Sequence, residues 1–343
     1  MTANPRYKQI DKFESEFWNI VSKAMNIKVE GMATSASSSM NGPITFNARF
    51  PTKNRNLEGT RYLNKEIKKI LHFTSLQKMF SIINESSLRL YNLNNSNDTE
   101  EYIYAANKLR SIYLAQGIKK EDIEKQVILK KEYSFICSCT TTNEISNATF
   151  WKEYGYSGKG VAIEFEIVND VLDWEYFYLS KVQYNNSKVF DTLINEWSKI
   201  QSVNPIIRYN ISLDQILSLH KSLDWQDENE IRILSLYPDL HQSVYNDLIY
   251  TDINPYGGLN KQVKYFKLPL CNDKKEFTDP AFNERTELFW HIIPRIKISD
   301  IHFGPDFDFG GDIKNYQVEL RVYIAEKLGC FIRTFPKNKV EIK

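Results

Sequence analysis

The spacing of apolar positions changes along the chain. In the first 26 residues these positions recur at helical intervals, at Ile10, Phe13, Phe17, Ile20, Val21 and Ala24. Residues three and four apart share one face of a helix, so the pattern predicts an amphipathic helix that begins after Pro5. The serine-rich stretch at residues 31–43 is bounded by glycine and is typical of a linker. We therefore expect residues 1–66 to form a helical extension with a linker, followed by a domain at residues 67–343.

From about residue 68, short apolar runs alternate with longer helical patterns. The expected strands are KKILHF, LRLY, YSFICSC, GVAIEFEI, SKVQY, EIRILSL, QVKYFKL and RVYIA. The expected helices lie at residues 76–84, 99–114, 120–132, 188–200 and 211–222. Because the elements are irregularly spaced and show no repeating βαβ period, the pattern predicts an α+β fold rather than a doubly wound parallel sheet.

The composition limits the possible binding partners but does not identify one. The chain has 343 residues and a net charge of +1, so any attraction to nucleic acid must come from a local patch. The N-terminus lacks the pattern of a signal peptide, and no run approaches the roughly 18 apolar residues of a membrane helix. We expect a cytoplasmic protein with no membrane partner.

The four cysteines are expected to be reduced, because there is no secretory signal. Cys137 and Cys139 are spaced for one face of a strand, whereas Cys271 and Cys330 are remote from them. As zinc ligands the first pair would lack a second pair nearby. The sequence therefore favours small buried hydrophobes and no metal, with a zinc site as the alternative.

Two segments carry polar groups at the ends of expected strands. His72 follows Leu71 and precedes Phe73, so its side chain is expected on the opposite face, and Ser75 is expected to cap the helix that follows. In the second segment a period of two places Glu228, Glu230 and Arg232 on one face of a strand. The alternatives are a structural histidine and an edge strand bearing solvated charges.

A third segment is an aromatic turn. Trp151 and Tyr154 precede a Gly-rich stretch at residues 155–160, which leads into an expected strand and is therefore a turn rather than a phosphate loop. The two rings either line a pocket for a flat ligand or close the core beneath the turn.

The order of these segments resembles a bacterial family known as domain of unknown function 2971. The motifs that carry the resemblance are His72-Phe73-Thr74-Ser75, Leu88-Arg89-Leu90-Tyr91, Asn97-Asp98, Phe135-Ile136-Cys137-Ser138, Trp151-x-x-Tyr154 with residues 160–165, Lys181-Val182-Gln183-Tyr184, residues 225–232, and Ile301-His302-Phe303-Gly304-Pro305. The resemblance covers about residues 68–336. Phe73 stands where the family usually has tyrosine, and Asn97-Asp98 lacks the proline that commonly follows.

A looser resemblance connects the histidine, the aromatic pocket and the late Glu-x-Glu with mono-ADP-ribosyltransferases, including bacterial toxins. It implies a mixed, mainly antiparallel sheet core with inserted helices, NAD as the substrate and no metal. In such an enzyme Glu230 would stabilise the oxocarbenium-like transition state at the ribose, and Glu228 would orient or deprotonate the acceptor.

The same resemblance implies the residues that bind NAD. His72 would contact the ribose hydroxyls, and Thr74 or Ser75 would hold the nicotinamide amide. Tyr91 or Tyr154 would stack on the nicotinamide ring. Arg232 would pair either with the pyrophosphate or with one of the glutamates.

The expected function is an NAD-dependent ADP-ribosyltransferase, acting as a toxin or phage-defence effector on RNA, DNA or protein. An antitoxin or other regulatory partner would restrain it. The alternative is a non-catalytic nucleic-acid-binding or sensor module, in which aromatic residues interleaved with Lys152 and Lys159 stack on unpaired bases.

Overall fold

The computed structural model describes most of the chain after residue 50. The described residues are part of 12–26, then 34–37, 44–49, 51–95, 102–115, 117–184, 187–203, 207–212, 217–236, 248–254, 261–283 and 292–335. The structure describes only part of the first expected helix. Its described residues between Lys12 and Ala24 are helical, and residues 1–11 lie outside the described part of the chain.

A six-stranded antiparallel sheet forms the centre of the molecule, with the order β12-β13-β4-β5-β11-β7. Its strands are β4 (Ser87–Asn92), β5 (Ser134–Cys139), β7 (Phe177–Lys181), β11 (Ile231–Leu236), β12 (Ile249–Asn254) and β13 (Lys261–Pro269). Strand β11 is buried along its whole length because it has a neighbour on each side and cover on both faces.

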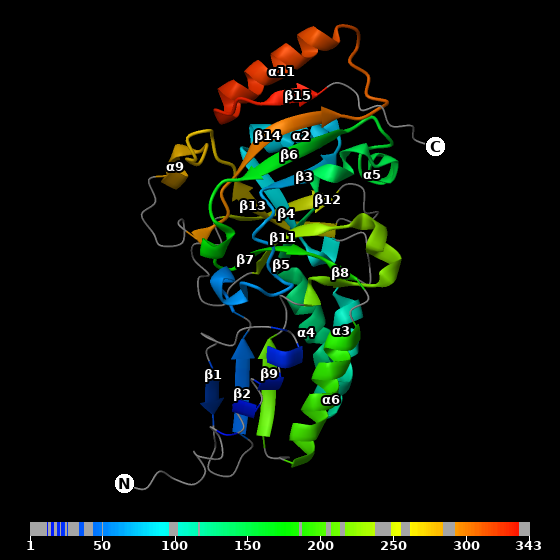
Figure 1. The fold of residues 1–343 in the computed structure, drawn as a ribbon, viewed down its shortest axis with the longest axis vertical. Helices are drawn as coiled ribbons and strands as arrows, with labels where there is room; N and C mark the ends of the chain where they lie inside the picture. The colour runs from blue at the N-terminus through cyan, green and yellow to red at the C-terminus, as the bar shows by residue number, and fades with distance from the viewer. Residues whose placement is uncertain are drawn as a thin grey trace.

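A four-stranded sheet lies beside it with the order β15-β14-β6-β3 (Figure 1). Its strands are β3 (Lys69–Thr74), β6 (Val161–Ile167), β14 (Ile296–Phe303) and β15 (Arg333–Phe335). The two sheets meet where Leu71 of β3 and Thr140, just after β5, exchange two backbone hydrogen bonds of 2.9 Å. This bridge places the residues after Leu71 against the end of β5.

The other described strands form two smaller sheets. Strands β1 (Thr34–Ser37), β2 (Ile44–Arg49) and β9 (Ile207–Ser212) form one sheet, and β8 (Gln183–Tyr184) pairs with β10 (His220–Lys221) in parallel. Part of the expected linker at residues 31–43 is therefore strand β1, and its other residues lie outside the described ones. Leu57 and Tyr62 are fully buried in the main core. The division at residues 66/67 stays a prediction.

The described helices lie beside the two sheets and toward both ends of the molecule (Figure 1). They are α2 (Leu76–Asn84), α3 (Ile103–Ala115), α4 (Lys120–Glu132), α5 (Ala148–Glu153), α6 (Ser187–Val203), α9 (Pro280–Asn283) and α11 (Ile313–Leu328). Short 3-10 turns are η1 (Asn54–Leu57), η2 (Leu93–Asn95), η3 (Thr142–Ser146), η4 (Val171–Asp173) and η5 (Leu223–Glu228).

The α+β class is confirmed, and antiparallel pairing dominates both large sheets. Ser75 caps α2 as expected, because its Oγ accepts a hydrogen bond from Lys78 N at 3.3 Å. Two elements were predicted wrongly. RVYIA is part of α11, where Leu320, Ile324 and Leu328 form a buried helical stripe behind the N-cap Asp312. The expected helix at residues 211–222 contains strand β10. No described helix has the length and apolar character needed to cross a membrane.

The four-stranded sheet contains a buried carboxylate whose ionisation we expect to stabilise the fold. Glu164 of β6 accepts hydrogen bonds from Lys69 Nζ at 2.6 Å and Ser299 Oγ at 3.0 Å, and His302 Nε2 lies 3.7 Å away. The nearby His302, opposed by burial and assisted by Lys69 and Ser299, lowers the pKa of Glu164 to about 2.

Because this pKa is lower in the folded than in the unfolded chain, the stabilisation is full above about pH 4.5 and is lost as the pH falls toward 2. We predict that Glu164→Gln flattens the decline of the unfolding free energy between these pH values. Urea unfolding at a series of pH values measures the slope, and Glu326→Gln on the exposed side of α11 should keep the wild-type slope. Equal slopes for wild type and Glu164→Gln would contradict the prediction.

Candidate functional site

Lys221 lies at the centre of a buried cluster of charges. Strand β10 holds it beside Tyr184 of β8, and its side chain is 6% exposed. Its Nζ lies 2.6 Å from Glu228 Oε2 and 3.0 Å from Glu230 Oε2. The ring of Trp225 lies beneath the ammonium, 5.3 Å from ring centroid to Nζ. One lysine therefore bridges two carboxylates.

Glu230 is the most enclosed carboxylate of this cluster, with 4% of the residue exposed. Its Oε1 accepts from Ser138 Oγ at 2.5 Å and from Arg232 Nε at 2.7 Å. Its Oε2 accepts from Arg232 Nη2 at 2.9 Å and from Lys221. Four donors thus occupy the roughly four lone-pair positions of a carboxylate. A substrate group would have to displace one of them.

Arg232 explains why this face of β11 is polar although it is buried. It is 0% exposed and stands opposite Ser138 of β5 and Ser180 of β7. Besides its two bonds to Glu230, it donates to the backbone oxygen of Ser218. The sequence left open whether Arg232 pairs with a pyrophosphate or with a glutamate, and in the structure it pairs with Glu230. The interpretation as a solvated edge strand is wrong, because β11 lies inside the sheet.

Glu228 occupies the outer side of the cluster. It accepts from Tyr154 Oη at 2.6 Å through Oε1 and from Lys221 Nζ through Oε2, and its side chain is 16% exposed. The expectation that Glu228 lies on the strand with Glu230 is wrong, since Glu228 ends η5. Asn229 then takes a left-handed conformation with φ of 39° before β11 begins. The turn brings Glu228 over Lys221 from a different direction.

Burial and mutual attraction shift the protonation of these groups. Burial raises the pKa of Glu230, and the contacts with Lys221 and Ser138 lower it. For Lys221, burial lowers the pKa, but Glu230 and Glu228 raise it more, so the net shift is upward. Burial and the bond to Glu228 raise the pKa of Tyr154. Lys221 therefore stays charged and Tyr154 stays a hydrogen-bond donor.

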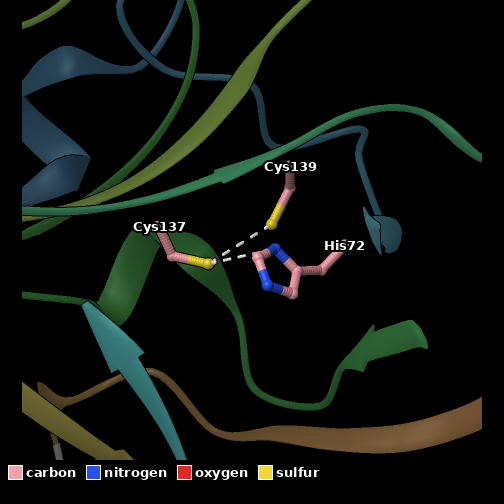
Figure 2. Close-up of side chains that lie close together, drawn as sticks. All are labelled: His72, Cys137 and Cys139. Carbon is pink, nitrogen blue, oxygen red and sulfur yellow. Dashed lines mark hydrogen bonds between the residues drawn. The ribbon is translucent and has the colours of Figure 1, made fainter. Parts of the chain in front are cut away.

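His72 lies across Ser138 from this cluster. Its Nδ1 is 3.0 Å from the Ser138 backbone oxygen and 3.8 Å from Cys137 Sγ (Figure 2). Cys139 Sγ lies 3.7 Å from Cys137 Sγ. The hydrogen bond with Cys139 lowers the pKa of Cys137, and burial raises it. With the further lowering by His72, the pKa of Cys137 is about 5.

The other residues expected to bind NAD are spread over several elements. Thr74 is buried at the end of β3, where its backbone oxygen contacts Gly160 so closely that a Cβ there would come within 2.4 Å. Ser75 uses its hydroxyl as the cap of α2. Tyr91 is 38% exposed on β4, where its ring contacts that of Tyr265. Tyr154 is the expected aromatic that touches the charge cluster.

Several residues of the cluster were not predicted: Ser138, Tyr184, Ser218, Lys221 and Trp225. Tyr184 accepts from the backbone N of Glu230 at 3.0 Å. The signal for Ser138 was its position between two cysteines in an apolar strand, since alternation places the hydroxyl on the face opposite the thiols. Lys221 carried no comparable signal, because its contacts depend on β10 pairing with β8.

Comparison with known proteins gives a family match that overlaps part of this cluster. A family model described as a protein of unknown function (DUF2971) matches residues 150–233. That stretch contains Tyr154, Lys221, Glu228, Glu230 and Arg232, whereas His72 and Ser138 precede it. No curated protein and no solved structure matches the chain significantly. The match supports the resemblance to this family, over a shorter range than the motifs had suggested.

Glu230 is predicted to be essential for stability. In Glu230→Gln the buried Lys221 and Arg232 lose a shared counter-charge, and breaking a buried pair in this way typically costs about 3–5 kcal/mol. Urea unfolding at pH 8 measures the loss. The exposed Glu326→Gln should change the unfolding free energy by less than about 0.5 kcal/mol. A similarly small change for Glu230→Gln would show that the cluster does not depend on this charge.

Proposed function

We propose that the chain is an NAD-dependent mono-ADP-ribosyltransferase whose reaction centre is the cluster of Glu228, Lys221 and Glu230. The observation that carries the proposal is the pair of carboxylates bridged by a buried lysine, with the tyrosine hydroxyl of Tyr154 on the outer one. Transfer of ADP-ribose breaks the bond between nicotinamide and the ribose C1′, and positive charge develops on the ribose in the transition state. A fixed carboxylate stabilises that charge.

Glu228 is the carboxylate best placed to act on the substrate. Each of its oxygens accepts one hydrogen bond, and the side chain is partly exposed, whereas Glu230 is enclosed by four donors. We therefore assign to Glu230 the positioning of Lys221, and to Lys221 the positioning of Glu228. This assignment gives Glu228 the role at the ribose that the sequence resemblance implied for Glu230, and gives Glu230 a positioning role instead.

Aromatic rings at the edge of the cluster supply a surface for the flat parts of NAD. Tyr154 is 39% exposed and holds Glu228 through its hydroxyl, and Trp225 lies partly exposed beside Lys221. Stacking of the nicotinamide on Tyr154 would place its ribose bond near Glu228. We further propose that the acceptor of ADP-ribose is RNA, DNA or protein. The chain would act as a toxin or defence effector and would be restrained by a regulatory partner.

One observation favours a second candidate, a non-catalytic nucleic-acid-binding module. Tyr156 is 68% exposed and takes a positive φ of 53° in the turn after α5, with Lys152 and Lys159 exposed nearby in the sequence. Exposed rings beside cations can stack on unpaired bases. Such binding would weaken steeply with salt and would not require NAD.

The test compares wild type with Glu228→Gln in NAD hydrolysis and in transfer of label from NAD to a cell extract. Glutamine keeps the size of the side chain and removes the charge, so we predict a loss of about 100-fold or more. Glu164→Gln is a matched control, since it neutralises a buried, lysine-bonded carboxylate of the other sheet and should retain activity at neutral pH. Digestion of labelled product with protease, DNase and RNase identifies the acceptor.

Two outcomes would overturn the proposal. One is a folded wild-type protein that neither hydrolyses NAD nor labels any extract, including extracts from cells exposed to phage. The other is a Glu228→Gln variant as active as wild type. Salt-sensitive binding of single-stranded nucleic acid, with no effect of NAD, would then support the binding module.

A further inference from the structure

We propose that His72, Cys137 and Cys139 form a binding site for a thiophilic transition-metal ion of the zinc type. This site does not rest on the proposed transferase activity and uses no residue of the cluster of Glu228, Lys221 and Glu230. His72, for which the resemblance implied a contact with the ribose, is here a metal ligand. Among the described residues, these three form the group whose ligand atoms come together, all within 4.8 Å of one another. Their side chains converge from two strands (Figure 2).

The fold brings the three ligands together through backbone pairing. Cys137 and Cys139 share one face of β5 because alternate residues of a strand point the same way. The bridge between Leu71 and Thr140 sets β3 antiparallel to the end of β5, and continuing its register places His72 opposite Cys139. Side chains opposite each other in such a pair are close neighbours.

The distances suit tetrahedral coordination. With Zn–S bonds of about 2.3 Å, two thiolates on one zinc ion are about 3.8 Å apart. Cys137 Sγ and Cys139 Sγ are 3.7 Å apart, and Cys137 Sγ and His72 Nδ1 are 3.8 Å apart. Nδ1 would exchange its hydrogen bond to the Ser138 backbone oxygen for the ion on binding. The sulfurs are thus already near the spacing that an ion would impose, and far beyond the bond length of a disulfide.

The donor set selects the class of ion. Two thiolates and one imidazole favour zinc or copper(I) over magnesium or calcium, which prefer oxygen. Both thiols are nearly buried, at 3% and 6% exposed, whereas His72 is partly exposed and gives access from the surface. Three protein ligands leave one coordination position for water or a substrate atom, the arrangement of zinc sites that perform chemistry.

Metal content tests the proposal directly. Protein expressed with zinc in the medium, purified without chelator and analysed by elemental mass spectrometry should contain about one zinc per chain. After removal of zinc, addition of cobalt(II) should produce a thiolate-to-metal absorption band and visible bands of tetrahedral cobalt. Cys137→Ser, Cys139→Ser and His72→Gln should each lose stoichiometric zinc, and the cysteine variants should also weaken the charge-transfer band.

Cys271 and Cys330 provide the matched control, because both are buried and free and lie apart from the cluster. Cys271→Ser and Cys330→Ser should retain zinc and the cobalt spectrum. If a ligand variant fails to fold, cobalt titration of the metal-depleted wild type still decides the question, and it requires no NAD. A folded wild type without zinc, copper or iron that gives no cobalt spectrum would overturn the proposal. So would control variants that lose metal as fully as the ligand variants.

Discussion

The buried ion cluster around Glu230 constrains the whole central sheet. Lys221 and Arg232 are almost completely removed from water, and both would lose a carboxylate that they share if Glu230 moved. Arg232 also donates to the Ser218 backbone, and Ser138 donates to Glu230. The cluster therefore connects β5, β11 and the segment of β10. A small displacement of any of these segments would expose a charge to an apolar interior.

This constraint gives the outer carboxylate its geometry. Glu228 is not held by the sheet, since it ends η5 and is separated from β11 by the left-handed Asn229. It is held instead by Lys221 and Tyr154, and Lys221 is held by Glu230. The enclosed glutamate thus determines where the exposed one lies. In the proposed enzyme, Glu230 would therefore position the cluster and Glu228 would contact the ligand.

The sequence predicted about half of the described strands and the helices that have clear periodicity, and it missed β12 and β14 of the two large sheets. The alternation in residues 134–139 and 161–167 and the helical spacing in residues 76–84 correspond to β5, β6 and α2. Glu230 and Arg232 were correctly placed on one face, but local alternation cannot show that this face is buried, because that depends on β5 and β7. The left-handed turn at Asn229 likewise depends on contacts made by Glu228 and Thr140.

The contacts that bring several candidate residues together join positions far apart in the chain. Ser138 and Glu230 are 92 positions apart, Tyr154 and Glu228 are 74 apart, and His72 and Cys137 are 65 apart. The first pair meets through the pairing of β5 with β11, and the last through the bridge between β3 and the end of β5, and local alternation shows neither. Ser138 contacts both groups, with its hydroxyl on Glu230 and its backbone oxygen on His72. Strand β5 therefore lies between the charge cluster and the group of His72, Cys137 and Cys139.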